Sequence, residues 1–360
     1  MRYTTRNRRG KRIKIAHIYT LPEHGIKKGR VDRDALKIVN RLHDAGYQVY
    51  IVGGAVRDML LGIDPKDIDI VTDALPNTIR KLFRQARIIG RRFRLVHIQL
   101  GRKIFEVSTF RAKTEVQKNV YGTMEEDVHR RDFTINALYY CPIKEQIIDY
   151  VGGVKDIRSA KIRALLPPAK SFMEDPVRMI RAIKYASITG FSLPLKIKKY
   201  IQKYAGELWN CSSSRLTEEM LKILKSGFSK KIMEYSLKLN VFNYFFPGMA
   251  ALIDNVPDNK RQKGTWKKNF LENLERLDRE VGTYGDVKRG KMLAVFCESF
   301  LTRAVAWDVE PSLLHQEIFL ALKRMLRPMT PPNKDVEQAV KIILHGKRQA
   351  LTPGQRISSL

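Results

Sequence analysis

Cysteine is scarce in this sequence: only Cys141, Cys211 and Cys297 occur among 360 residues. They lie too far apart to form a CxxC zinc motif, and a small odd number is typical of a reducing compartment, so we expect a cytoplasmic protein. Long apolar runs are also missing. The longest, near Ala137–Ile143, has about seven residues, whereas a membrane span needs roughly 20. No apolar segment follows the basic N-terminus, as it would in a secretory signal peptide.

Acidic residues are few relative to basic ones. The chain has 37 Asp and Glu against 67 Lys and Arg, which gives a formal net charge of +30. The hydrophobic content of 44% is nevertheless enough for folded cores, which excludes a basic disordered tail. A field this positive favours phosphate-bearing partners, namely nucleic acids, nucleotides or anionic lipids, without choosing among them.

The pattern of apolar residues predicts three parts. Residues 1–30 hold ten Lys and Arg and one acid, Glu23, and are predicted to form a mobile basic arm that either binds nucleic acid or is simply solvated. Short β-branched runs alternate with helical patterns over residues 31–160, which predicts a compact α+β domain. The strands are expected at Gln48–Val52, Ile68–Thr72, Phe93–Leu100 and Lys103–Phe110, with a helix over Asn77–Ala86. Beyond about Pro168 the spacing becomes helical throughout, and Asp254–Lys268 resembles a polar loop.

The segment Ile51–Thr72 carries the most informative motif. A predicted strand runs into Gly53 and Gly54, and a predicted helix with Arg57 follows. Paired glycines let a backbone approach a phosphate closely, and a helix N-terminus attracts its charge. A tight strand-to-helix turn explains the same glycines without any ligand.

Asp67 and Asp69 flank Ile68 at the start of the next predicted strand. Positions i and i+2 of a strand face the same side, so the two carboxylates repel each other unless cations share them. This arrangement suits Mg²⁺, and a two-metal site usually needs a third carboxylate. Glu106, within KIFEVSTF, is our first choice and Asp149, within IIDYVGG, is held in reserve; either residue can instead be a surface or turn acid.

Two further charged groups follow along the chain. If Glu125–Tyr140 is helical, Asp132 and Asn136 share a face beside Arg131, where they can grip a ribose or triphosphate; a charged helix surface is the alternative. In EDPVRMIRA, Asp175 precedes Pro176 as a helix N-cap would. Asp175 and Arg178, with Arg181 nearby, can also present an acceptor and donors to the edge of adenine or cytosine.

Several motifs occur in order over about residues 45–240: GGAVRD, KDIDI, EVSTFR, RRDFTINALYY, DYVGG and EDPVRMIRA. Together they resemble the bacterial poly(A) polymerase and CCA-adding nucleotidyltransferase family, class II of the DNA polymerase β superfamily. The resemblance implies a polymerase β-like head (palm) at 31–160, a helical neck that recognises the base at 161–240, and a helical, RNA-binding body and tail at 241–360.

The resemblance also implies a role for each matched residue. Asp67 and Asp69 fall on the metal-binding carboxylates, and Glu106 or Asp149 falls where a third is assigned. Gly53, Gly54 and Arg57 match the triphosphate loop. The ribose and phosphate motif is matched by Arg131, Asp132 and Asn136. Asp175 and Arg178, within the motif that also contains Arg181, match the base-selecting motif.

The expected activity is template-independent transfer of AMP from ATP to an RNA 3′-hydroxyl, with Mg²⁺ or else Mn²⁺ as the cofactor. Residues Ile89–Ile98 and the pair Tyr139-Tyr140 resemble the polymerase branch more than the CCA branch. The alternatives are CCA or A addition to tRNA, an inactive RNA-binding protein, and, last, a binder of anionic membranes, which the absence of a basic amphipathic helix disfavours. The expected partner is an RNA 3′ end; the sequence predicts no membrane and leaves protein partners unknown.

Overall fold

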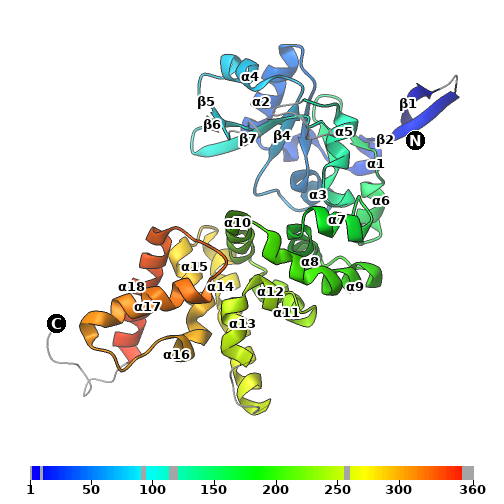
Figure 1. The fold of residues 1–360 in the computed structure, drawn as a ribbon. Helices are drawn as coiled ribbons and strands as arrows, with labels where there is room; N and C mark the ends of the chain where they lie inside the picture. The colour runs from blue at the N-terminus through cyan, green and yellow to red at the C-terminus, as the bar shows by residue number, and fades with distance from the viewer. Residues whose placement is uncertain (1, 9–10, 91–94, 113–120, 255–259, 351–360) are drawn as a thin grey trace. The chain divides into compact units, whose positions relative to one another are not determined.

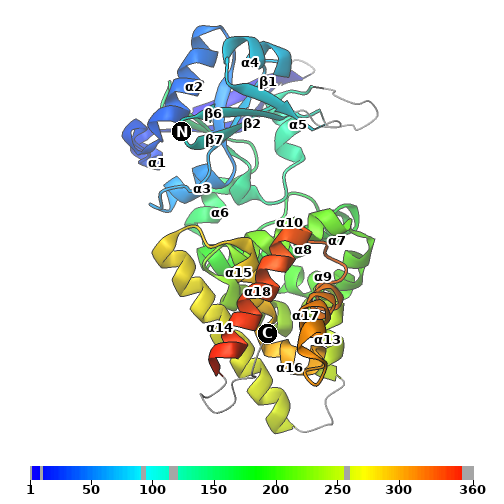
Figure 2. The same ribbon diagram turned by 90° about the vertical axis from the view of Figure 1, so that its left-hand side faces the viewer.

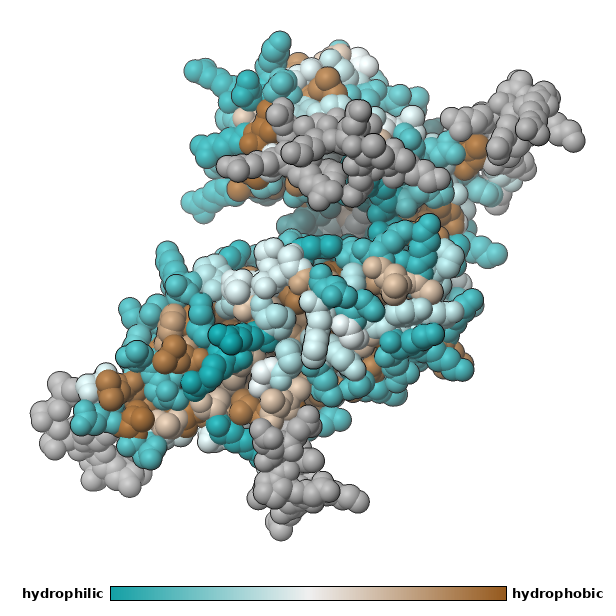
Figure 3. All heavy atoms as spheres, viewed as in Figure 1, coloured by the Kyte–Doolittle hydropathy of each residue, from teal (hydrophilic) through white to brown (hydrophobic). Residues whose placement is uncertain are grey.

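The computed structural model describes residues 2–8, 11–90, 95–112, 121–254 and 260–350. The chain divides into two compact units, Met1–Pro167 and Pro168–Leu360, and each is described by itself. Within the described ranges, none of the helices combines the length and the apolarity needed to cross a bilayer. Figure 3 shows a largely hydrophilic surface on the visible face of both units, which agrees with the excess of basic residues.

The first unit is built on a nine-stranded mixed sheet of order β1-β2-β9-β8-β3-β4-β7-β6-β5 (Figure 1). Its strands are β1 (Arg2–Arg8), β2 (Lys11–Thr20), β3 (Val49–Val52), β4 (Asp69–Thr72), β5 (Ala86–Ile89), β6 (Leu95–Leu100), β7 (Lys103–Thr109), β8 (Leu138–Cys141) and β9 (Gln146–Asp149). Every named pair is antiparallel except β4 with β7, which run parallel. This one parallel pair brings the first residue of β4 beside the middle of β7.

Helices complete the first unit: α1 (Leu21–His24), α2 (Arg33–Asp44), α3 (Gly54–Leu60), α4 (Pro76–Leu82), α5 (Met124–His129) and α6 (Gly153–Arg158). The N-cap of α2 is Asp32, whose carboxylate accepts hydrogen bonds from the backbone N–H groups of Asp34 and Ala35 at 2.8 and 3.2 Å. The buried stripe of α2 packs on β3 and beside α4 (Figure 2). A cluster of hydrophobic side chains lies where α5 covers the central strands, and Val71, Val128 and Tyr139 in it are fully buried.

The segment 1–30 corrects the sequence analysis. It is not a separate arm, because β2 pairs with β9 from His17–Asp149 to Thr20–Gln146, and β1 pairs with β2. The sequence of β2 alternates apolar and polar residues as a strand does. The side of β9 that does not pair with β8 is open to pairing, so β2 joins the sheet there. Whether it binds nucleic acid stays a prediction.

Other expected elements shift as well. The helix after Pro76 ends at Leu82, and Ala86 already begins β5. Residues 91–94, the centre of the polymerase-like stretch Ile89–Ile98, lie outside the described residues. The expected loop at Asp254–Lys268 is wrong from Lys260 onward, because these residues open the long helix α14; residues 255–259 are not described.

The second unit is helical, as predicted. It contains α7 (Pro168–Glu174), α8 (Val177–Thr189), α9 (Leu195–Tyr204), the 3-10 helix η3 (Ala205–Asn210), α10 (Ser213–Leu224), α11 (Ser229–Lys238), α12 (Phe242–Phe245), α13 (Pro247–Asp254), α14 (Lys260–Tyr284), α15 (Arg289–Cys297), the 3-10 helix η4 (Glu298–Phe300), α16 (Leu301–Ala304), α17 (Pro311–Met325) and α18 (Asn333–Ala350). Its core is aromatic: Phe246 and Phe296 lie 4.9 Å apart between ring centroids, and Trp266 and Phe300 lie 5.1 Å apart. The fold class predicted from the sequence is therefore confirmed.

Candidate active site

Gly53 lies where β3 turns into α3, and two constraints act on it. Its φ of +73° is a conformation that side chains with a Cβ rarely adopt. A Cβ added there would also lie 3.3 Å from Nη1 of Arg131 and 3.9 Å from Oδ2 of Asp69. The turn therefore places a bare stretch of backbone between a carboxylate of β4 and an arginine that follows α5.

The two aspartates of KDIDI lie at the start of β4. Asp67 precedes the strand and Asp69 is its first residue; both are exposed, whereas Ile68 and Ile70 are buried at 8% and 0% exposure. This alternation is the one predicted from the sequence. The neighbouring Glu106 pairs with Asp69 in the parallel register of β4 and β7, so their Cα atoms are about one strand spacing, 4.8 Å, apart.

Glu106 lies at the half-exposed middle of β7, and its other cross-strand neighbour is His97 on β6. The His97 Nε2 and Glu106 Oε2 atoms are 3.9 Å apart. Over the described ranges, no three His, Cys, Asp or Glu side chains already converge as a cage for a metal ion. Mg²⁺ commonly uses one or two protein carboxylates together with substrate phosphates, so exposed carboxylates beside a glycine turn fit that cation.

Asp149 does not join this group. It lies on β9, which is separated from β4 by β8 and β3, or about 14 Å at three strand spacings. Its Oδ1 accepts backbone hydrogen bonds from Val151, Gly152 and Gly153 at 2.7 to 3.0 Å, and its Oδ2 accepts one from Val154 at 3.0 Å. The fully buried carboxylate therefore holds the DYVGG turn, and the structure does not bring it to Asp69.

The DYVGG turn has a neighbour that explains its glycines. A Cβ on Gly153 would lie 2.3 Å from the carbonyl oxygen of Thr134, so only glycine permits this contact. Thr134 also donates a hydrogen bond of 2.6 Å to Asp156 of α6. The motifs DYVGG and RRDFTINALYY thus form one packed structure beside the site.

Arg57 is buried at 6% exposure and is enclosed by polar partners. Its Nε and Nη2 donate to Oδ1 of Asp58 at 2.9 and 2.7 Å, and its Nη1 donates to Oδ1 of Asn136 at 2.8 Å. Asn136 in turn donates to Asp132 at 3.2 Å. The sequence pattern grouped Asp132 with Asn136 correctly, but not through a helix, because α5 ends at His129 and a 3-10 turn at Thr134–Asn136 brings Asn136 back to Asp132. The link from Asn136 to Arg57 was not predicted.

Arg131 is held by a residue that the sequence analysis did not single out. Its Nη2 donates to Oδ2 of Asp127 at 3.0 Å, and Arg111 donates to Oδ1 of the same carboxylate at 3.0 Å. Tyr139 completes the group by donating its hydroxyl to Asp127 Oδ2 at 2.6 Å. Asp127 and Arg131 are spaced i,i+4 within α5 and its C-terminal turn, and that spacing was the available signal.

The protonation states follow from this packing. Burial raises the pKa of Asp127, but the positive charges of Arg131 and Arg111 outweigh it and hold the pKa below its usual range. Burial, together with the negative charge of Asp127, raises the pKa of Tyr139. Asp127 is therefore an anion and Tyr139 a neutral donor over the physiological range.

The remaining predicted site residues lie in the second unit. Asp175 does not cap α8, whose N-cap is Pro176 and has no side-chain cap bond. Its Oδ2 instead accepts a hydrogen bond of 2.8 Å from Arg215 on α10 and lies 3.7 Å from Nε of Arg178. Arg178 also donates to the hydroxyl of Ser171 at 3.2 Å. Asp175 and Arg178 are thus brought together, as the sequence predicts.

Arg181 belongs to a second cluster of charged side chains, which lies about one turn further along α8 and α10 than the Asp175 cluster. It donates to Glu219 of α10 at 3.2 Å, and Lys184 donates to the other oxygen of Glu219 at 2.5 Å. Burial alone would raise the pKa of Glu219, but Lys184 and Arg181 lower it; burial lowers the pKa of Lys184. Arg215 and Glu219 are the two residues here that the sequence gave no means to find, because their partners are distant in the chain.

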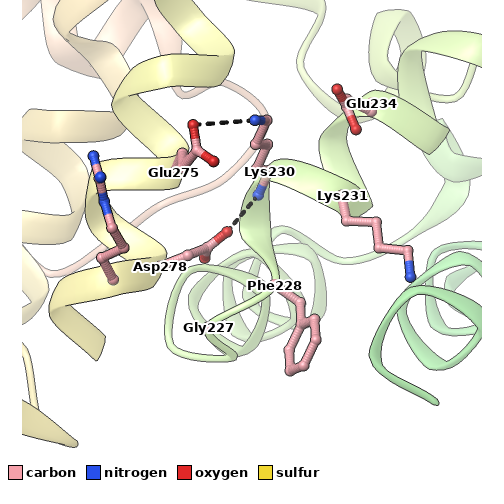
Figure 4. A pocket seen from close by; sticks show the side chains of 8 residues that line it. Gly227, Phe228, Lys230, Lys231, Glu234, Glu275 and Asp278 are labelled. Carbon is pink, nitrogen blue, oxygen red and sulfur yellow. Dashed lines mark hydrogen bonds and ion pairs between the residues drawn. The ribbon is translucent and has the colours of Figure 1, made fainter. Parts of the chain in front are cut away.

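A shallow pocket of about 530 Å³ also lies in this unit, between α11 and α14 (Figure 4). Two of its three acids, Asp278 and Glu275, have structural partners. Asp278 accepts the backbone N–H groups of Ser229 and Lys230 at 2.7 and 2.9 Å, and Glu275 pairs with the Lys230 ammonium at 3.1 Å. Asp278 therefore caps the N-terminus of α11, and Glu275 is paired with a lysine of the same helix.

Comparison with known proteins agrees with these features. Residues 49–163 match the family described as the poly A polymerase head domain, and residues 190–253 match a probable RNA- and SrmB-binding site of polymerase A. The chain belongs to the poly(A) polymerase and CCA-adding nucleotidyltransferase family.

Individual relatives fall on both branches of this family. Poly(A) polymerase I of Escherichia coli O157:H7 is 40% identical over 258 residues, which cover 67% of this chain and 56% of that protein. The CCA-adding enzyme of Bacillus pumilus is 38% identical over 250 residues, covering 68% and 61%. The chain thus spans little more than half the length of these relatives.

A solved structure is similar over a longer range. The Bacillus stearothermophilus CCA-adding enzyme in complex with CTP superposes with a TM-score of 0.63 and 29% identity, covering 87% of this chain and 69% of that one. Poly(A) polymerases and CCA-adding enzymes are both nucleotidyltransferases. Neither identity nor fold separates the two branches for this chain.

Proposed function

We propose that this protein is a cytoplasmic, template-independent nucleotidyltransferase that transfers AMP from ATP to the 3′-hydroxyl of RNA and releases pyrophosphate. The observation that carries the proposal is that Asp69 and Glu106 are neighbours on two parallel strands, with the bare Gly53 turn beside Asp69. Acidic side chains there, in a chain of net charge +30, make sense as ligands for cations that accompany a triphosphate.

Each residue has a proposed part. Asp67 and Asp69 hold Mg²⁺, with Glu106 as the adjacent third carboxylate. The ion, when bound, lowers the pKa of the attacking hydroxyl and neutralises charge on the phosphates. The Gly53–Gly54 backbone lets the triphosphate approach closely, and Arg131 offers positive charge beside that turn.

Arg57 and Asp132 act through Asn136. The buried guanidinium of Arg57 holds the amide of Asn136, which Asp132 restrains from the other side. We assign Asn136 to hydrogen bonding with the nucleotide and the other two residues to positioning it. Asp175, Arg178 and Arg181 are proposed to select the base.

The family likeness to poly(A) polymerase I supports AMP addition. The similar identity to a CCA-adding enzyme, and the fold shared with a CTP complex, keep CCA addition to tRNA as the second candidate. An inactive RNA-binding protein is the third candidate, and the retained carboxylates argue against it.

One experiment separates these candidates. A generic RNA and a tRNA without its 3′ end are each incubated with one nucleoside triphosphate at a time in the presence of Mg²⁺. A long ladder with ATP on both RNAs is the expected result, whereas a short, CTP-dependent product on the tRNA alone would overturn it. Failure to incorporate any nucleotide, with Mn²⁺ as well, would identify the inactive protein. Asp69→Asn and Asp67→Asn should abolish incorporation while the thermal unfolding midpoint stays near that of the wild type.

A further inference from the structure

Trp209 is the most exposed of the described tryptophans, at 67% exposure. It lies at the end of η3, which continues directly from α9. Its ring centroid is 6.3 Å from that of Tyr244 on α12, with the planes tilted by 58°. A large aromatic side chain that the core does not use indicates a binding surface when charged groups of one sign accompany it.

Those charged groups are present. The sequence Leu195–Asn210 contains four lysines and a single acid, Glu207, whose carboxylate is occupied by a 2.8 Å hydrogen bond from Asn210. Lys196, Lys199 and Lys203 are all exposed, and their i, i+3, i+7 spacing places them on one stripe of α9. The stripe leads along the helix toward Trp209.

Aromatic rings accompany this stripe. Tyr200 and Tyr204 stack with centroids 5.9 Å apart and planes within 6° of parallel. Tyr244 is held against the backbone of η3, because a Cβ on Gly206 would lie 3.6 Å from its ring. The rings of Trp209 and Tyr244 thus come from two elements that pack on each other, which fixes their relative position.

We propose that Trp209 and Tyr244 form a stacking platform for an unpaired RNA base, and that the α9 lysines track the adjoining phosphates. Single-stranded nucleic acids bind to surfaces that combine aromatic rings with positive charge. The rings stack on the bases, and the positive side chains pair with the phosphates. The surface lies within residues 190–253, and its occupant as RNA rests on the proposed function. The Lys184–Glu219 cluster, by contrast, is buried and offers no such surface.

The test measures binding of a long, unstructured RNA oligonucleotide to the full chain by fluorescence anisotropy. Trp209→Ala should weaken binding roughly 10- to 100-fold, since removing a stacked ring commonly has this effect. Trp209→Phe should restore most of the affinity. Tyr284→Ala removes an aromatic of similar exposure, 75%, from the end of α14 and should bind as the wild type does.

Salt dependence distinguishes stacking from charge. Changing Lys196, Lys199 and Lys203 together to Gln should reduce the slope of log affinity against log salt by about 2, whereas Trp209→Ala should leave the slope unchanged. RNA should also quench part of the tryptophan fluorescence of the wild type, and this part should vanish in Trp209→Ala. Trp209→Phe, which keeps an aromatic ring at this position, serves for the same comparison if Trp209→Ala folds poorly.

Unchanged affinity and unchanged quenching in Trp209→Ala would overturn the platform and leave this surface to a protein partner. Primer extension by the wild-type protein tests the proposed function separately. If the wild-type protein extends no primer, the proposed function fails, and the binding measurements still decide the platform.

Discussion

Arg57 and Asn136 are 79 positions apart, yet Nη1 of Arg57 donates a 2.8 Å hydrogen bond to the side-chain oxygen of Asn136. The bond joins the helix after the glycine turn to the 3-10 turn before β8. It links the motifs GGAVRD and RRDFTINALYY into one structural unit. A substitution in either motif should therefore alter the position of side chains in the other.

Arg57→Lys tests this bond. Lysine cannot make the paired contacts to Asp58 and also reach Asn136, so we expect a loss of about 1–3 kcal/mol in the free energy of unfolding and a reduced rate of nucleotide addition. Arg80→Lys, at an exposed position of α4, is the matched control and should change neither quantity. Urea denaturation and primer extension provide the measurements, and a wild-type rate in Arg57→Lys would contradict the positioning role.

Gly53→Ala is expected to harm both stability and activity. The positive φ costs about 1–3 kcal/mol for a residue with a Cβ, and the methyl group would press on Arg131. Gly264→Ala is a control in the helix α14, where nothing lies within 4 Å of the added atom; it should stabilise the protein by about 0.5–1 kcal/mol. Equal effects of the two substitutions would show that the Gly53 turn is unconstrained.

Asp127 should give the head an acid-sensitive component of stability. Its folded-state pKa is depressed, so its contribution is present above the unfolded value of about 3.9 and is lost as the pH falls through the folded value. Asp127→Asn leaves Arg111 and Arg131 without their shared anion and should cost about 3–5 kcal/mol at neutral pH. The difference between wild type and variant, followed by urea unfolding, should shrink as the pH is lowered below 4. A constant difference would rule out the linkage.

Glu219→Gln should destabilise the second unit by about 3–5 kcal/mol, because it leaves the buried Lys184 without its anion. The double variant Lys184→Met/Glu219→Leu should recover much of this loss, since it removes both charges. Chemical denaturation of the single and double variants gives the coupling free energy. Glu218→Gln, one position earlier and exposed, is the control.

Arg215→Gln tests whether the partner of Asp175 affects base choice. The substitution removes the 2.8 Å bond that orients the carboxylate and should change the ratio of ATP to CTP incorporation about tenfold. Lys222→Gln changes an exposed lysine of the same helix and should leave the ratio unaltered. An unchanged ratio in Arg215→Gln would separate Asp175 from base selection.

Much of the fold was accessible from the sequence because local patterns carry it. The alternation around Ile68 and Ile70 predicts both the strand and the exposed side of Asp69, and the helical half follows from three- and four-residue spacing. For the basic segment at 11–20, the charge led to the wrong prediction of a mobile arm. Its isoleucines alternate with lysine and arginine as in a strand, but its composition indicates an arm.

The rest depends on pairings between distant residues. The choice of Glu106 over Asp149 follows from strand order, which places one beside Asp69 and the other three strands away. The pairing of Asp175 with Arg215 similarly requires α8 to meet α10. Asp127 differs, because its spacing from Arg131 was visible in the sequence and a search for i,i+4 ion pairs would have found it.

The outermost strand of the head sheet, β1, has the sequence RYTTRNR. An edge strand offers a row of backbone groups to any other strand, including the same strand of a second molecule, and like charges along it oppose such pairing. Three arginines in seven residues therefore protect the sheet against growth from one copy to the next. In this segment the excess of positive charge therefore acts as a safeguard against aggregation.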